Sequence, residues 1–213
     1  MRAKERMAAL IALLEELYPS AECALKYGGD PWRLLVMGRL SAQCTDARVN
    51  EVCVELFREL PTVYDFAEAP LFRIEELIRS CGLFRMKAQN LQDAARLLIT
   101  EYGGEVPDSM DELLKIPGIG RKIANLLLGD LFGQPAIVAD THCIRLAARF
   151  GFVPKGEKDP YKVEKALAAI TPPEKSADLC HRIVFFGREV CTARNPHCDG
   201  CPARDLCKSK GTF

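Results

Sequence analysis

The segment that decides the fold runs Leu113-Leu114-Lys115-Ile116-Pro117-Gly118-Ile119-Gly120-Arg121-Lys122-Ile123-Ala124-Asn125. It predicts a helix, a tight turn with two nearby glycines, and a second helix. Because glycine tolerates positive φ, backbone N–H groups of the turn can converge beside the free donors of the second helix. Such a nest favours an anion. Lys115, Arg121 and Lys122 lie in the same segment with no acidic residue between them, which suits a DNA phosphate. Gly118, Gly120 and Arg121 are therefore candidate DNA contacts, and a plain corner between helices is the alternative.

Helical patterns extend from this hairpin in both directions. Apolar residues recur at helical spacing in residues 7–14, 52–60 and 91–98, and no convincing alternating strand is present. Asp30-Pro31 predicts a helix start, and Tyr102-Gly103-Gly104 predicts a helix end. The apolar run 135–139 is interpreted as a buried connector. We predict an all-α protein of about ten short helices.

Composition limits the classes of function. The chain has 213 residues, enough for a large core, and its 29 basic residues balance 29 acidic ones. No global positive field attracts nucleic acid, so DNA binding must depend on local charge. The N-terminal apolar stretch is too short and too charged for a signal peptide or membrane span. We expect a soluble cytoplasmic protein.

The ten cysteines form two populations. Six are scattered in apolar helical patterns and are mostly interpreted as small buried hydrophobes: Cys23, Cys44, Cys53, Cys81, Cys143 and Cys180. The other four are crowded near the C-terminus as Cys191-x6-Cys198-x2-Cys201-x5-Cys207. Structural zinc usually takes two short cysteine pairs, and only one is present here. Four thiolates from one loop suit a 4Fe-4S cluster, and zinc stays the alternative.

Several motifs together resemble the endonuclease III family of the helix-hairpin-helix glycosylase superfamily. They are residues 116–122, Val138-Ala139-Asp140-Thr141-His142, the four-cysteine loop, Leu40-Ser41-Ala42-Gln43 and Cys81-Gly82-Leu83. The resemblance covers nearly the whole chain in family order. It implies a two-domain α-fold with DNA in the cleft between the domains. Residues 24–134 would form a six-helix barrel domain with the hairpin, and residues 1–23 and 135–213 would form an iron-sulfur cluster domain.

The resemblance also implies roles for individual residues. Lys122 would be the nucleophile, with Asp140 as its carboxylate partner. Gln43 would fill the gap left by a flipped nucleotide, and Leu83 would wedge into the opposite strand. The ordinary alternatives are a solvated phosphate contact for Lys122, a helix N-cap for Asp140, a surface polar residue for Gln43 and apolar packing for Leu83. We expect the positive end of the helix dipole and a nearly dry pocket to disfavour the charged form of Lys122.

The chain departs from the family pattern at four positions, Gly38, Arg39, Ile123 and Phe186. None coincides with the implied nucleophile, carboxylate or cluster ligands, so these departures bear on the damaged-base preference and leave the reaction type unchanged.

The function implied is base excision repair by a monomeric DNA glycosylase/AP lyase. It would remove oxidised or ring-saturated pyrimidines from double-stranded DNA and cleave the abasic site by β-elimination. One alternative is a sister glycosylase for alkylated purines or mismatched thymine. Another is a non-enzymatic iron-sulfur DNA-binding module, which leaves the Lys122 and Asp140 pair unexplained. An adenine glycosylase is disfavoured, because that branch generally lacks lysine at the position of Lys122 and has a further C-terminal domain.

Overall fold

A computed structural model describes residues 2–212, and every regular element in that range is helical. It contains eleven α-helices and three 3-10 helices, so the all-α prediction is confirmed. The chain divides into two compact units. The hairpin unit is Ala24–Phe132, and the terminal unit joins the chain up to Cys23 with the chain from Gly133 onward. No helix between residues 2 and 212 combines the length and the apolar composition needed to cross a bilayer.

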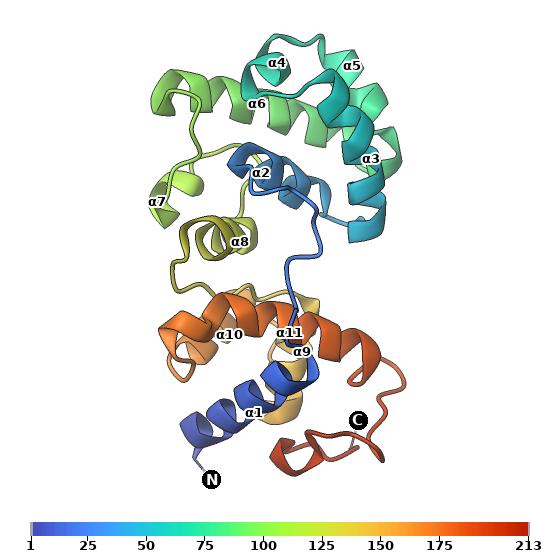
Figure 1. Cartoon of the computed structure of the whole chain (residues 1–213), viewed down its shortest axis with the longest axis vertical. Helices are drawn as coiled ribbons and strands as arrows, with labels where there is room; N and C mark the ends of the chain where they lie inside the picture. The colour runs from blue at the N-terminus through green and yellow to red at the C-terminus, as the bar shows by residue number, and fades with distance from the viewer. Residues whose placement is uncertain (1, 213) are drawn as a thin grey trace. The chain divides into compact units, whose positions relative to one another are not determined.

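The hairpin unit is organised around a buried central helix, α2 (Figure 1). Its α-helices are α2 (Pro31–Leu40), α3 (Asp46–Glu59), α4 (Val63–Glu68), α5 (Leu71–Leu77), α6 (Phe84–Tyr102), α7 (Met110–Leu113) and α8 (Arg121–Phe132), with the 3-10 helix η1 at Arg79–Cys81. α2 begins as predicted, because the Asp30 side chain accepts a hydrogen bond from Arg33 N and Pro31 occupies the first turn. Eight of its ten residues are buried, and α3, α6 and α8 pack against it.

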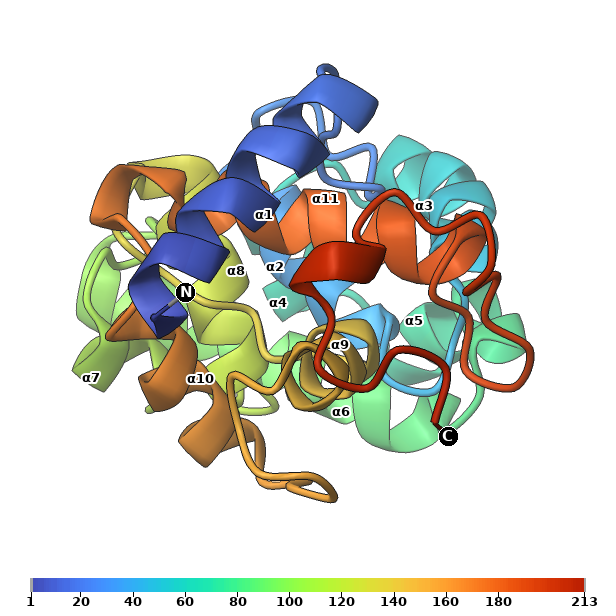
Figure 2. The ribbon, with the colours of Figure 1, turned by 90° about the horizontal axis from the view of Figure 1, so that it is seen from below.

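The terminal unit is a second helical cluster. Its elements are α1 (Ala3–Leu17), α9 (Thr141–Phe150), α10 (Pro160–Ala168), η2 (Pro173–Lys175), α11 (Ser176–Glu189) and η3 (Arg204–Leu206). α11 packs against α1 and α9, and η3 lies beside α1 (Figure 2). The shared core includes Leu10, Leu146 and Phe186. Arg6 links α1 to the end of α9, because its Nη2 donates a hydrogen bond to the Phe150 carbonyl at 2.5 Å.

The segment before α9 has no regular structure, and Ala136 and Ile137 within it are buried. Its interpretation as a buried connector is therefore confirmed. Of the six scattered cysteines, Cys53, Cys81, Cys143 and Cys180 are buried, whereas Cys23 and Cys44 are half-buried.

Candidate functional site

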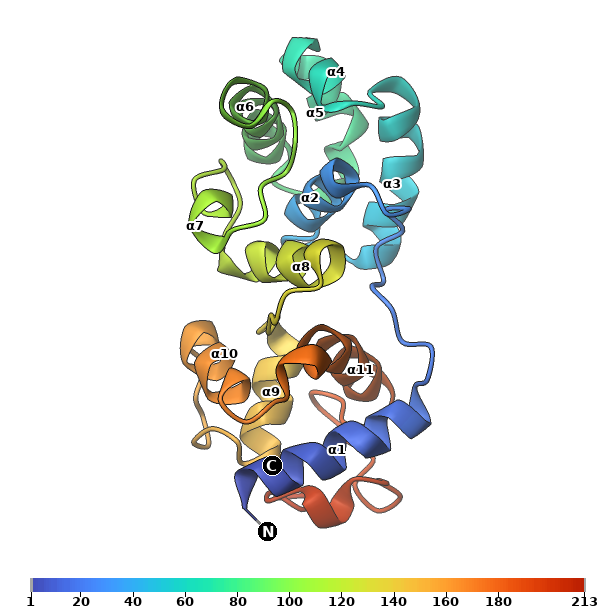
Figure 3. The same cartoon turned by 60° about the vertical axis from the view of Figure 1, so that its left-hand side comes forward.

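The hairpin joins the short helix α7 to α8 in the hairpin unit (Figure 3). Ile116 and Ile119 are 2% and 6% exposed, whereas Gly118 and Gly120 face solvent. The Gly120 carbonyl accepts hydrogen bonds from the N–H groups of Ile123 and Ala124, at 2.9 and 3.0 Å. Two isoleucines thus anchor the turn while its glycines stay accessible. The first N–H groups of a helix have no acceptor within that helix, so the start of α8 is suited to an anion.

The two hairpin glycines are required for different reasons. Gly118 has φ of +80°, and a β-carbon there would lie 2.6 Å from Nε of Arg39 and 2.9 Å from Cβ of Asn90. Arg39 is buried and donates from Nη2 to Oδ1 of Asn90 at 2.8 Å. A β-carbon on Gly120 would meet nothing within 4 Å. Gly118 is therefore fixed by internal packing, whereas packing within the protein leaves space for a side chain at position 120.

Lys122 lies in the first turn of α8, as predicted, and its side chain is exposed. The expectation of a nearly dry pocket is therefore wrong for the protein without DNA. The physical reason is local, because the first turn of α8 directly follows an accessible turn. Asp140 is the N-cap of α9 in the terminal unit, and its Oδ1 accepts a hydrogen bond from Cys143 N at 2.7 Å. The pairing of Lys122 with Asp140 stays a prediction.

Gln43 and Leu83 share an unusual backbone conformation. Their φ angles are 55° and 47°, and only one other non-glycine residue between positions 2 and 212, Lys210, has a positive φ. Gln43 follows α2, and Leu83 is the N-cap of α6. Both side chains are exposed, with Leu83 at 52%. Apolar packing therefore does not explain Leu83, and strained, exposed residues of this kind are common at functional sites.

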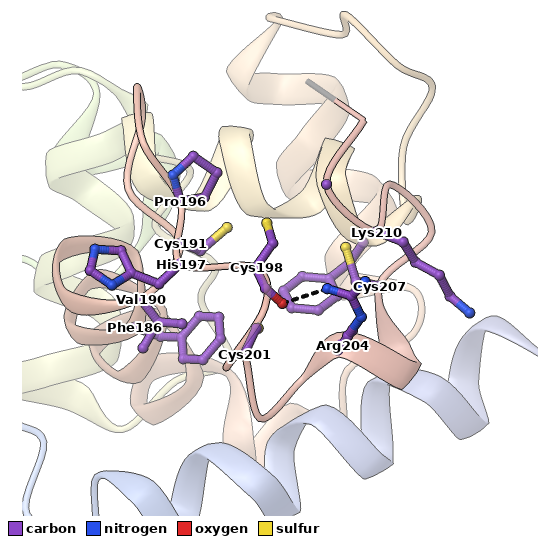
Figure 4. Close-up of a pocket in the computed structure, with 12 residues that line it drawn as sticks. Phe186, Val190, Cys191, Pro196, His197, Cys198, Cys201, Arg204, Cys207 and Lys210 are labelled. Atoms are coloured by element: carbon purple, nitrogen blue, oxygen red, sulfur yellow. Dashed lines mark hydrogen bonds between the residues drawn. The ribbon is translucent and has the colours of Figure 1, made fainter.

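The four C-terminal cysteines line one pocket in the terminal unit. Figure 4 shows them between the end of α11 and η3, with Phe186 and His197 also in the lining. Arg204 Nη1 donates to the Cys198 carbonyl at 2.7 Å and supports the loop. Burial raises the pKa of the Cys201 thiol. Over residues 2–212, no three His, Cys, Asp or Glu side chains are arranged to hold a single metal ion.

Two arginines of α9, which the sequence analysis missed, hold the start of this loop. Arg149 donates from Nη1 to the Thr192 carbonyl at 2.7 Å and to Sγ of Cys191 at 3.2 Å. Arg145 donates from Nε to the Cys191 carbonyl at 3.1 Å. The sequence does hold a signal for Arg149, because a basic residue next to the apolar stripe of an amphipathic helix can be buried and then needs acceptors. Its acceptors lie about 43 positions away and could not be found by spacing alone.

The structure accounts for all four departures from the family pattern. A β-carbon on Gly38 would lie 3.1 Å from Cγ2 of Ile123, so glycine in α2 leaves space for isoleucine in α8. Arg39 packs against the hairpin turn at Gly118. Phe186 is fully buried, and its ring lies 6.4 Å from that of Phe150. It is therefore a core residue beside the cysteine pocket.

Comparisons with known proteins agree with this fold. Residues 36–173 match the HhH-GPD superfamily base excision DNA repair protein family. The chain is 42% identical to endonuclease III of Bacillus subtilis (strain 168) over 193 residues, 91% of this chain and 87% of that protein. It is 34% identical to endonuclease III of Escherichia coli (strain K12) over 207 residues, 97% of each chain.

Solved structures give the same result. An endonuclease III trapped as a covalent intermediate with DNA has a TM-score of 0.93 at 42% identity, covering 100% of this chain and 99% of that one. A thermostable thymine-DNA glycosylase has a TM-score of 0.89 at 21% identity, covering 98% of each chain, and shows the shared fold alone.

A helical fold with a glycine hairpin, matched by these relatives, defines a base excision DNA repair protein of the helix-hairpin-helix class. The chain belongs to the endonuclease III family. The predicted helix-hairpin-helix fold and the prediction of a base excision repair DNA glycosylase/AP lyase are thereby confirmed.

Proposed function

We propose that this protein excises oxidised or ring-saturated pyrimidines from duplex DNA and then cleaves the abasic site with Lys122 as nucleophile. The observation that supports the proposal most is the placement of Lys122. Its exposed amine lies in the first turn of α8, two residues after the accessible Gly120. A phosphate bound at the hairpin would bring the adjoining sugar of the same strand within reach of this amine.

The chemistry follows from an amine at that position. The neutral amine attacks C1′ of the sugar, and the bond from C1′ to the base breaks as the base leaves. Ring opening gives a Schiff base between Nζ and C1′. Loss of a proton from C2′ then expels the 3′ phosphate, and the strand is cut on the 3′ side of the lesion. Bound DNA would exclude water from Lys122, which the free protein leaves exposed.

Asp140 would supply the carboxylate for this reaction. Its Oδ1 is held by Cys143 N at 2.7 Å, which fixes the side chain at the start of α9. A carboxylate so oriented can take the proton from the attacking amine and stabilise positive charge developing on the sugar. Capping and catalysis are compatible, because a carboxylate has acceptor capacity on both oxygens.

Duplex DNA would be held by the hairpin and opened by two exposed side chains. Backbone N–H groups around Gly118 and Gly120, with Arg121, would bind a phosphate. Gln43 would occupy the space left by the flipped nucleotide, and Leu83 would enter the opposite strand. Both side chains are exposed, and both residues have a left-handed backbone. These features support the assignment, because backbone strain clusters at functional sites.

A 4Fe-4S cluster would be bound by Cys191, Cys198, Cys201 and Cys207. All four line one pocket, and Arg149 donates to Sγ of Cys191, as donors around iron-sulfur thiolates do. Structural zinc usually takes two short cysteine pairs, and this loop has only one, which favours a cluster over zinc. The cluster would organise the loop between α11 and the C-terminus. Excision itself needs only the amine and the carboxylate.

A panel of duplexes, each with one defined lesion, tests the proposed substrate class. We expect nicks at ring-saturated and oxidised pyrimidines and at preformed abasic sites, resolved on denaturing gels. Cleavage only at alkylated purines or at mismatched thymine would identify a sister activity of the same fold. Intact strands on every substrate, with retained DNA binding, would indicate a binding module.

A further inference from the structure

One buried lysine connects the two segments that carry Gln43 and Leu83. Lys87 lies on the first turn of α6 and is fully buried. Its Nζ donates to the Leu40 carbonyl at 2.8 Å and to the Cys81 carbonyl at 2.6 Å. Leu40 is the last residue of α2, three positions before Gln43, and Cys81 ends η1, two positions before Leu83. A single ammonium group thus joins the ends of two elements that are far apart in the sequence.

Joining two carbonyls through a buried ammonium group is energetically unfavourable, because the charged group loses its hydration. Burial lowers the pKa of Lys87, the nearby Cys81 and Cys44 thiols oppose that shift, and the Arg39 guanidinium adds to it. The interactions of Lys87 within the described residues include no carboxylate. A buried cation without an anion costs free energy that an apolar side chain would avoid. The arrangement therefore indicates a requirement beyond core packing.

We propose that Lys87 is a positioning residue that fixes the spacing of the Gln43 and Leu83 segments, so that both enter the base stack together. This inference rests on the proposed roles of Gln43 and Leu83. Inserting two side chains into a duplex requires neighbouring bases to unstack, and the strained segments must resist the opposing force. Two short hydrogen bonds to one buried Nζ would hold the backbone on both sides against that force.

The test compares Lys87→Met with a matched control on the same helix. Gln92 is also buried on α6, and its Nε2 donates to the Ala69 and Phe66 carbonyls at 2.7 and 3.4 Å. Gln92→Leu removes a comparable tether that lies away from Gln43 and Leu83. Each variant holoenzyme is assayed under single-turnover conditions on two substrates. One has an abasic site in a fully paired duplex, and the other has the same site inside a short mismatched bubble.

We expect Lys87→Met to cleave the paired substrate about 100-fold more slowly, the loss expected when a reacting geometry shifts by roughly 1 Å. The bubble should largely restore the rate, because its bases are already unstacked. Gln92→Leu should show no such difference between substrates. An equal loss on both substrates would mean that Lys87 only stabilises the fold, and an unchanged rate on the paired duplex would overturn the inference.

A second pair of variants separates this inference from the proposed function. If Leu83→Ala and Gln43→Ala cleave the paired duplex at the wild-type rate, the proposed roles of those residues fail. If they slow cleavage and Lys87→Met does not, only the positioning role fails. Lys87→Gln, which keeps a polar N–H group, replaces Lys87→Met if the latter is insoluble. Failure of both Lys87 variants to fold would make the residue a stability element and contradict the inference.

Discussion

Gly38 and Ile123 are complementary in shape, because a β-carbon on Gly38 would lie 3.1 Å from Cγ2 of Ile123. The contact joins the central helix α2 to α8, the helix that bears Lys122. Gly38→Val should therefore overpack this contact and destabilise the protein by about 1–3 kcal/mol. Ile123→Ala in the same chain should recover much of that loss. Urea unfolding of the two single variants and the double variant measures the coupling, and strictly additive effects would show that the two positions are independent.

The hairpin glycines should separate folding from DNA binding. Gly118→Ala forces a side chain into a left-handed backbone against Arg39, so it should lower the free energy of unfolding by about 1–3 kcal/mol. Gly120→Val adds atoms where the protein has free space, so the fold should tolerate it. The added side chain would instead obstruct a phosphate and weaken binding to all duplexes alike. Fluorescence anisotropy on two unrelated duplexes checks this, and undiminished affinity of Gly120→Val would rule out the hairpin as a phosphate site.

We expect the free energy of unfolding to fall in mild acid because of His142. Burial lowers its pKa, the neighbouring Asp140 raises it, and the Arg145 and Arg188 guanidinium groups lower it further. Arg145 Nη2 lies 3.1 Å from Nδ1 of His142, so a second positive charge on the imidazole would face a guanidinium group. In the unfolded chain, His142 binds a proton near its ordinary pKa of about 6.5. In the folded chain, the same residue binds that proton only at lower pH. This contribution to stability is complete above about pH 6.5 and falls as the pH decreases toward the lower folded-state pKa.

Urea midpoints at about pH 7.5 and about pH 5.5 measure this effect. His142→Gln keeps an acceptor for Arg145 and does not titrate, so its midpoint should fall less than that of the wild type. Equal decreases for both proteins would assign the acid sensitivity to other groups.

The cysteine pocket predicts a bound cluster. Freshly purified protein should be yellow-brown and contain iron and acid-labile sulfide in a ratio of about 1:1. Cys201→Ser should reduce cluster content and lower thermal stability, because loop order depends on the ligands. Cys180→Ser, outside the pocket, is the matched control and should keep the cluster. Stoichiometric zinc without sulfide would contradict the assignment.

Local signals predicted much of the fold. Asp30-Pro31 begins α2, Gly103 ends α6 in the left-handed conformation, and the glycine hairpin precedes α8. These features depend on neighbouring residues, which a sequence displays directly. The exposure of Lys122 was not predicted, because accessibility depends on which other segments cover a helix end.

Contacts between segments that are distant in the sequence could not be predicted from local signals either. Lys87 in an amphipathic helix resembles any solvated lysine until Leu40 and Cys81 are placed around its amine. Arg149 likewise gains its role from carbonyls in the cysteine loop. The family resemblance pointed to Gln43 and Leu83, and the structure adds the backbone strain that the two residues share.

Borohydride trapping shows whether Lys122 is the nucleophile. Borohydride reduces a Schiff base between enzyme and sugar to a stable adduct, which migrates as a protein–DNA complex on a denaturing gel. Lys115→Gln, which removes an exposed lysine from the same hairpin, is the matched control and should still form the adduct. Wild-type protein should be trapped on abasic-site DNA, whereas Lys122→Gln should bind that DNA without forming an adduct or a nick. Trapping or full nicking by Lys122→Gln would show that Lys122 is not the nucleophile.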